Sequence, residues 1–85
     1  MSEDVKQAKK LIKDARLLID GANFKLNGIT QSYYDNLEVS LREGEIMGTG
    51  ALRSVKVQIM YIAGNIRARG DTQKIAKKEL HKLSK

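Results

Sequence analysis

The chain has 85 residues and a mass of 9.5 kDa, which is enough for one small domain spanning residues 1–85. It contains no cysteine and one histidine, His81. This composition excludes disulfides, thiolate zinc sites and histidine relays. We therefore expect a protein that is not an enzyme and that holds no metal and no cofactor. No apolar run approaches the roughly 20 residues that span a bilayer, and the N-terminus lacks the apolar core of a secretion signal, so we expect a cytoplasmic protein.

Positive charge is concentrated in the second part of the chain. The formal net charge is +6. Residues 1–50 hold seven Lys and Arg against eight Asp and Glu, whereas residues 51–85 hold nine against two. This asymmetry predicts a polyanionic partner, such as a nucleotide, DNA, RNA or an acidic protein surface.

The first element is a predicted long helix near residues 3–26. Its apolar residues alternate in steps of three and four, as on one helical stripe: Val5, Ala8, Ile12, Ala15, Ile19, Ala22 and Leu26. Asn27-Gly28 then supplies an expected left-handed stop. In an alternative interpretation, the helix ends at Gly21 and residues 24–30 form an Asn-Gly hairpin.

A second, short helix is predicted after a cap at Thr30 or Ser32, with Tyr34, Leu37 and Leu41 on its buried side. Three glycines within residues 44–50 interrupt the pattern and predict a turn. Four carboxylates cluster in this part of the sequence and are predicted to form a solvated acidic face that can meet a neighbour's basic tail: Asp35, Glu38, Glu43 and Glu45.

A third helix is predicted to begin at Thr49 or Gly50 and to end at Gly70, with a regular apolar stripe of Leu52, Val55, Ile59, Ile62 and Ile66. A final basic helix follows a cap at Asp71 or Thr72 and buries a thin edge of Ala76, Leu80 and Leu83. The predicted fold is all-α. It is a small helical hairpin or bundle in which the first and third helices form a long antiparallel pair, with a short bridging helix and a basic C-terminal helix.

Several apolar residues lie outside these stripes, namely Leu11, Leu18, Val57, Met60 and Tyr61. A chain of this size with only four aromatic residues has a marginal core. The sequence therefore predicts a homo-oligomer in which these side chains are covered by another copy.

The start of the third helix is a candidate phosphate site. Glycines next to a helix N-terminus let an anion approach free N–H groups, and nearby cations can clamp its oxygens. The residues concerned are Gly48, Thr49, Gly50, Arg53 and Lys56. The alternative is an ordinary turn with Thr49 as the helix cap.

Tyr33 and Tyr34 are adjacent, so on a helix only one of the two faces the core. Tyr34 fits the buried side, which leaves Tyr33 as the candidate for stacking on a base. Tyr61 is expected at a boundary between protomers.

The C-terminal region is a candidate nucleic-acid interface. Its basic residues can neutralise several phosphates, and they are Arg67, Arg69, Lys74, Lys77, Lys78, Lys82 and Lys85. The alternative is a solvated face that keeps a small protein soluble.

Residues 51–69 resemble the second helix of a phage family, the helical-hairpin sponges that sequester the cyclic-oligonucleotide signals of bacterial anti-phage systems. The likeness rests on Met60 followed by the aromatic Tyr61, where the family usually has Trp, and on the closing Ile-Arg-Ala-Arg of residues 66–69. The phosphate-holding arginine of the family has no counterpart at matched spacing, and Arg53 is the nearest. The resemblance implies a non-catalytic homo-oligomer in the cytoplasm of a bacterial host, with ligand pockets between protomers.

The leading hypothesis is thus a non-catalytic, phage-type anti-defence protein that sequesters an anionic, cyclic nucleotide signal at protomer interfaces. One alternative is a small basic DNA- or RNA-binding protein that uses the C-terminal helix. Another is a helical inhibitor or adaptor that docks on a host protein.

Overall fold

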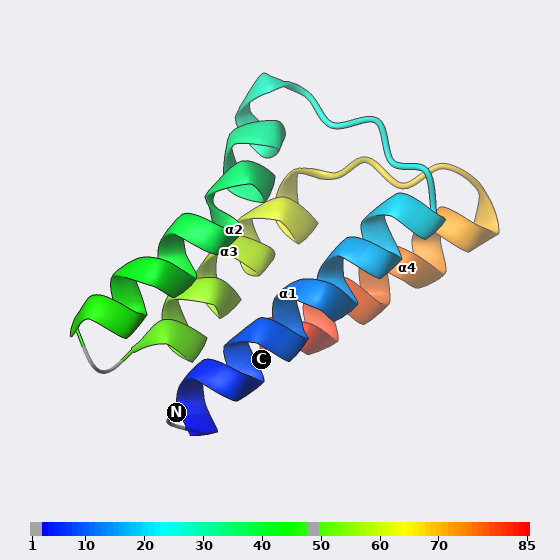
Figure 1. Ribbon diagram of the computed structural model, residues 1–85. Helices are drawn as coiled ribbons and strands as arrows, with labels where there is room; N and C mark the ends of the chain where they lie inside the picture. Colours follow the sequence, from blue (N-terminus) through cyan, green and yellow to red (C-terminus); the bar gives the residue numbers. More distant parts are fainter. Residues whose placement is uncertain (1–2, 48–49) are drawn as a thin grey trace.

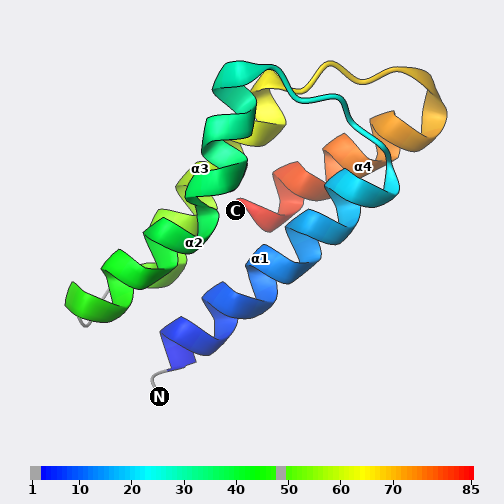
Figure 2. The ribbon, with the colours of Figure 1, turned by 45° about the horizontal axis from the view of Figure 1, so that its top comes forward.

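The computed structural model describes residues 3–47 and 50–85. It contains α1 (Glu3–Gly21), α2 (Gly28–Met47), α3 (Ala51–Asn65) and α4 (Gly70–Leu83) (Figure 1). The predicted all-α class is confirmed, and the described residues contain no strand. Successive helices run in opposite directions. As a result, the connections α1–α2 and α3–α4 lie at the same end of the bundle, a relation that is also visible in Figure 2.

The prediction of which helices form the long antiparallel pair is wrong. In Figure 1, α1 and α3 run in the same direction, and the side chain of Asp4 near the start of α1 reaches the amide of Leu52 near the start of α3. The close antiparallel pair is α2 and α3. Nor is the bridging helix short, because α2 has 20 residues, more than α1 or α3.

α1 ends at Gly21, five residues before the predicted end. Asn23 has a left-handed φ of 56°, its N–H donates to the carbonyl of Asp20, and the N–H of Phe24 donates to the carbonyl of Ile19. This is the Schellman pattern of helix termination, with asparagine in the position that glycine usually takes. The residue that terminates α1 is therefore Asn23, and not the predicted Asn27-Gly28. The alternative prediction, in which this helix ends at Gly21, gives the correct end of α1. Its second part, a hairpin at residues 24–30, is wrong because residues 24–27 are not in strands and α2 begins at Gly28.

Asn27 caps α2, instead of the predicted Thr30 or Ser32. Its side-chain oxygen accepts a hydrogen bond from the N–H of Thr30 at 2.9 Å, as an N-cap does. The helix continues to Met47 through the predicted glycine turn. Gly44 is buried in it, and a Cβ at this position would lie 2.3 Å from the Cα of Ala51. The glycine thus permits the backbones of α2 and α3 to approach closely, and its role is in packing.

α3 ends at Asn65, where the chain becomes extended at Ile66 with ψ 130°. Ile66 is nonetheless buried, so it contributes to the core from a connection and not from the predicted helical stripe. Gly70 does not close α3 but begins α4, with φ 70°. Arg69 occupies the N-cap position in place of Asp71 or Thr72.

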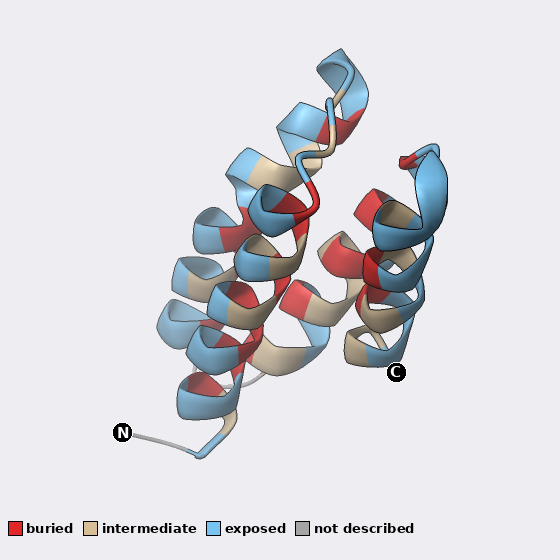
Figure 3. Cartoon of the chain, turned by 90° about the vertical axis from the view of Figure 1, so that its right-hand side faces the viewer, coloured by how far each residue is buried: buried red, intermediate tan, exposed pale blue. Residues whose placement is uncertain are grey.

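The buried residues face one another between the helices (Figure 3). The predicted stripes are confirmed for most positions, since the core includes Val5, Ala8, Ile12, Ala15, Ile19, Leu37, Val55, Ile59, Ile62, Ala76 and Leu80. Leu11 also belongs to the core, whereas Met60 and Tyr61 remain 45% and 42% exposed. Among the described helices, none has the length and apolar character needed to cross a membrane.

Candidate anion-binding site

The N-terminus of α3 is not the open phosphate site that the sequence predicts. Gly48 and Thr49 lie outside the described residues. Gly50, with φ 85°, is the N-cap of α3 and makes no side-chain cap hydrogen bond. The carboxylate of Asp4 instead accepts the N–H of Leu52 at 3.2 Å. A negative group therefore already occupies the end of the helix dipole where an anion would bind.

Arg53 and Lys56 do not form a clamp either. The Nζ of Lys56 donates to the backbone oxygen of Lys85 at 3.0 Å, which ties α3 to the end of α4. Arg53 is exposed and lines a hollow of about 330 Å³ that also contains the carboxylate of Glu43. Lys56 and Arg53 therefore lie in different surroundings, and Arg53 shares its hollow with the carboxylate of Glu43.

Tyr33 packs on Tyr61 across α2 and α3, with ring centroids 5.1 Å apart and a tilt of 36°. A tilted pair at this distance is a favourable aromatic contact within the chain. Tyr34 is only partly buried and does not lie in the centre of the core.

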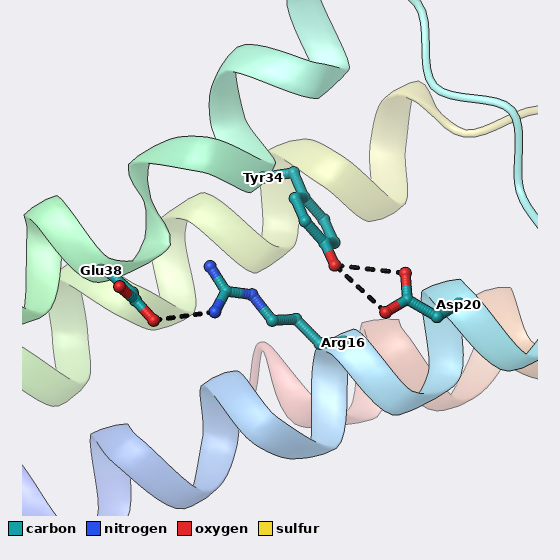
Figure 4. Close-up of polar contacts among 4 residues, drawn as sticks. All are labelled: Arg16, Asp20, Tyr34 and Glu38. Carbon is teal, nitrogen blue, oxygen red and sulfur yellow. Dashed lines mark hydrogen bonds and ion pairs between the residues drawn. The ribbon is translucent and has the colours of Figure 1, made fainter.

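Tyr34 belongs to a polar cluster that joins α1 to α2 (Figure 4). Its hydroxyl donates to the carboxylate of Asp20 at 3.2–3.3 Å, and the guanidinium of Arg16 lies 5.2 Å from its ring centroid. Arg16 also pairs with Glu38 at 2.9 Å. Burial, followed by the hydrogen bond to Asp20, raises the pKa of Tyr34. The neighbouring cleft of about 490 Å³ is lined by Asp20 and Glu38 together with Lys9, Lys13 and Arg16, so its positive charges already face carboxylates of the protein.

A second pocket, of about 380 Å³, lies between the two connections at the end of the bundle. We call it the loop pocket. Three cationic side chains line it, Lys25, Arg67 and Arg69, together with three asparagines and no carboxylate. Its full lining is Asn23, Lys25, Leu26, Asn27, Thr30, Asn65, Ile66, Arg67, Arg69 and Gln73. In surroundings without a carboxylate, cations and amides favour a negatively charged ligand.

Hydrogen bonds from α4 hold the walls of the loop pocket in place. Gln73 accepts the N–H of Arg69 at 2.9 Å and donates to the carbonyl of Ala22 at 3.2 Å, so a single side chain fastens both connections. Lys77 donates to the carbonyl of Ile66 at 2.8 Å. The side chains of Gln73 and Lys77 therefore fix the backbone of the two connections that form the walls of the pocket.

Of the residues predicted to bind nucleic acid, the structure brings Arg67 and Arg69 to this pocket. Lys77 has a structural role, because its Nζ bonds the α3–α4 connection. Lys74, Lys78 and Lys82 are exposed on α4, and Lys82 pairs with Glu79 at 3.2 Å.

Sequence reasoning missed Lys25 and the three asparagines Asn23, Asn27 and Asn65. Two of these asparagines have a local signal, since Asn23 and Asn27 flank a helix end and a helix start. Their proximity to Arg67 depends on the alternating direction of the helices, which the sequence pattern did not reveal.

Comparison of the chain with known protein families, curated proteins and solved structures finds no match. Within residues 3–47 and 50–85, no group of three or more His, Cys, Asp or Glu side chains is placed to hold a metal ion.

Proposed function

We propose that this protein is a non-catalytic binder of a phosphate-bearing ligand of the nucleotide class, held in the loop pocket. The observation that supports the proposal is the lining of this pocket, where Lys25, Arg67 and Arg69 meet without a carboxylate. The other two hollows each contain at least one acidic side chain.

The chemistry of the lining suits phosphate oxygens. An arginine guanidinium presents parallel N–H groups that match two oxygens of one phosphate, and lysine adds a mobile point charge. Asparagine amides such as that of Asn23 add neutral donors. The volume of about 380 Å³ falls in the range of small-molecule sites.

The resemblance of residues 51–69 to the phage sponges supports a sequestering role. Its closing residues Ile66, Arg67 and Arg69 all line the loop pocket. Sequestration requires affinity and no catalytic group. The proposal therefore includes an anti-defence role against a nucleotide signal in a bacterial cytoplasm.

A homo-oligomer is part of the same proposal. Met60 and Tyr61 are partly exposed on α3, and Ile46 and Met47 are each 78% exposed at the end of α2. Apolar side chains of this kind suit contacts between copies. The loop pocket itself is lined by residues of one chain.

Native mass spectrometry with a panel of cyclic dinucleotides, nucleoside monophosphates and a short DNA duplex tests this function. The double variant Arg67→Ala/Arg69→Ala is expected to lose nucleotide binding. Lys6→Ala/Lys10→Ala removes the same charge from an exposed face of α1 and serves as the matched control. Equal loss in both variants, or no nucleotide adduct with the wild-type protein, would contradict the proposal.

The alternative function is binding of a nucleic-acid backbone, which is favoured by the exposed lysines Lys74, Lys78 and Lys82 on α4. Duplex affinity would then fall steeply with salt, and reversal of these three charges would abolish it. Duplex binding that persists after reversal would exclude α4 as the interface.

A further inference from the structure

We infer that the loop pocket takes the terminal phosphate of a phosphomonoester and that the buried hydroxyl of Thr30 is one of its ligand donors. This inference rests on the function proposed above. It adds the phosphate class that the pocket selects and a role for Thr30 in ligand binding.

Thr30 is 1% exposed and lines the loop pocket. Its backbone N–H is already satisfied by the side chain of Asn27. Its hydroxyl oxygen, in contrast, is buried and has no hydrogen-bond partner among the described residues. Buried hydroxyl groups nearly always have a partner, because an unpaired one loses its hydrogen bonds to water without replacement. The oxygen has less than 1 Å² of accessible surface, so a ligand oxygen in the pocket would supply the missing partner once the Thr30 side chain rotates towards it.

Three of the described residues have a buried and unpaired side-chain atom, and of these Thr30 lines the loop pocket. The other two are Arg16 Nε, in the cleft between α1 and α2, and Gln58 Oε1, in the hollow beside Arg53. Of these three hollows in the described part of the chain, the loop pocket is the one where an unpaired hydroxyl occurs in a cationic lining without a carboxylate.

The number of donors and charges indicates which phosphate fits. Within the described part of the chain, the side chains of Lys25, Arg67 and Arg69 make no hydrogen bond or ion pair, so three positive charges stand without a counter-ion. A phosphomonoester offers three terminal oxygens and a charge of about −1.5 to −2 at neutral pH. A diester, as in a cyclic dinucleotide or a nucleic-acid strand, offers one charge per phosphate and two free oxygens. The terminal phosphate of a monoester therefore offers more oxygens and more charge to Lys25, Arg67 and Arg69 than one phosphate of a diester does.

The remaining lining supports a single phosphate. Leu26 and Ile66 are apolar, and they suit a sugar or base attached to the phosphate better than the next charged phosphate of a strand.

Calorimetric titration with adenosine 5′-monophosphate and with cyclic di-adenosine monophosphate tests this inference. The wild-type protein is expected to bind the monophosphate about tenfold or more tightly, because one phosphate then carries close to two negative charges, whereas the cyclic diester spreads a similar total over two phosphates. Equal or tighter binding of the cyclic diester would overturn the inference but leave the proposed function intact. Binding of neither compound would overturn both.

Thr30→Val and Thr30→Ser isolate the hydroxyl. Valine keeps the shape and removes an unpaired polar atom, so the variant is expected to unfold at an equal or higher urea concentration while its monophosphate affinity falls about tenfold. Serine keeps the hydroxyl and is expected to retain most of the affinity. Unchanged affinity in Thr30→Val would overturn the role of Thr30.

A third measurement needs no variant. The second pKa of a phosphomonoester is about 6, so the affinity of the wild-type protein for the monophosphate is expected to decrease as the pH falls through that value. A flat profile between about pH 7 and pH 5 would show that the dianion is not selected.

Discussion

The carboxylate of Asp4 in α1 accepts a hydrogen bond at 3.2 Å from the backbone N–H of Leu52 in α3. The two residues are 48 positions apart in the sequence. This contact joins the N-terminal ends of two helices that run in the same direction. It also places a negative charge where the helix dipole attracts anions. The loop pocket, the candidate anion site, lies at the opposite end of the bundle (Figure 1).

Asp4→Ala is expected to lower the free energy of unfolding by about 1 kcal/mol, because it removes both a cap for α3 and a favourable charge near its dipole. Urea unfolding followed by circular dichroism measures the loss. Glu3→Ala is the matched control, since Glu3 is an exposed carboxylate on the same helical turn. A loss of equal size in Glu3→Ala would show that Asp4 acts only through general charge.

Gly44→Ala and Gly64→Ala are expected to change stability in opposite directions. A Cβ at Gly44 would lie 2.3 Å from the Cα of Ala51, so α2 and α3 must separate, at a cost of about 1–3 kcal/mol. A Cβ at Gly64 meets nothing within 4 Å, and alanine there should stabilise α3 by up to about 1 kcal/mol. Thermal unfolding of both variants checks the pair. A neutral Gly44→Ala would mean that the two helices are not in close contact.

Tyr34→Phe is expected to destabilise the protein by less than about 1 kcal/mol at neutral pH, since it removes a partly exposed hydrogen bond to Asp20. Folding raises the pKa of Tyr34 above its usual value of about 10, chiefly through burial. The stabilisation is therefore fully present below pH 10 and is lost as the pH rises through the folded pKa. The difference in free energy of unfolding between the wild-type protein and Tyr34→Phe, measured by urea unfolding, is therefore expected to become smaller above pH 10. A difference that stays constant would show that the Tyr34 hydroxyl does not titrate in this way.

Gln73→Ala is expected to lower the free energy of unfolding by about 1–2 kcal/mol, because one side chain makes hydrogen bonds to both connections. Hydrogen exchange should also become faster at Arg69, whose N–H would lose its acceptor. Gln7→Ala, on the exposed face of α1, provides the control. Slow exchange at Arg69 in the variant would mean that another group holds the connection.

Helical periodicity was sufficient to find the core, because buried residues of amphipathic helices recur every three to four positions. It failed at Leu26 and Ile66, which fall on the predicted stripes but lie in the connections after α1 and α3. Ile66 is only 5% exposed, so the hydrophobic core extends beyond the end of α3. Periodicity alone cannot distinguish a helical residue from one that an extended connection delivers to the same core.

The candidate site was predicted only in part, for a related reason. Arg67 and Arg69 were recognised by their charge, but as part of a continuous basic surface. Lys25 joins them only because both connections lie at the same end of the bundle. The predicted site at Gly50 and Arg53 depended on a free helix N-terminus, and no local sequence signal revealed that Asp4 would fill it.

Amide chemical-shift mapping by nuclear magnetic resonance, on titration with adenosine 5′-monophosphate, tests whether the loop pocket binds a phosphate-bearing nucleotide. Saturable shifts are expected only in residues 23–30 and 65–73, and they are expected to be absent in Arg67→Ala/Arg69→Ala. Shifts centred on residues 50–56, or spread along the exposed lysines of α4, would exclude the loop pocket as the binding site.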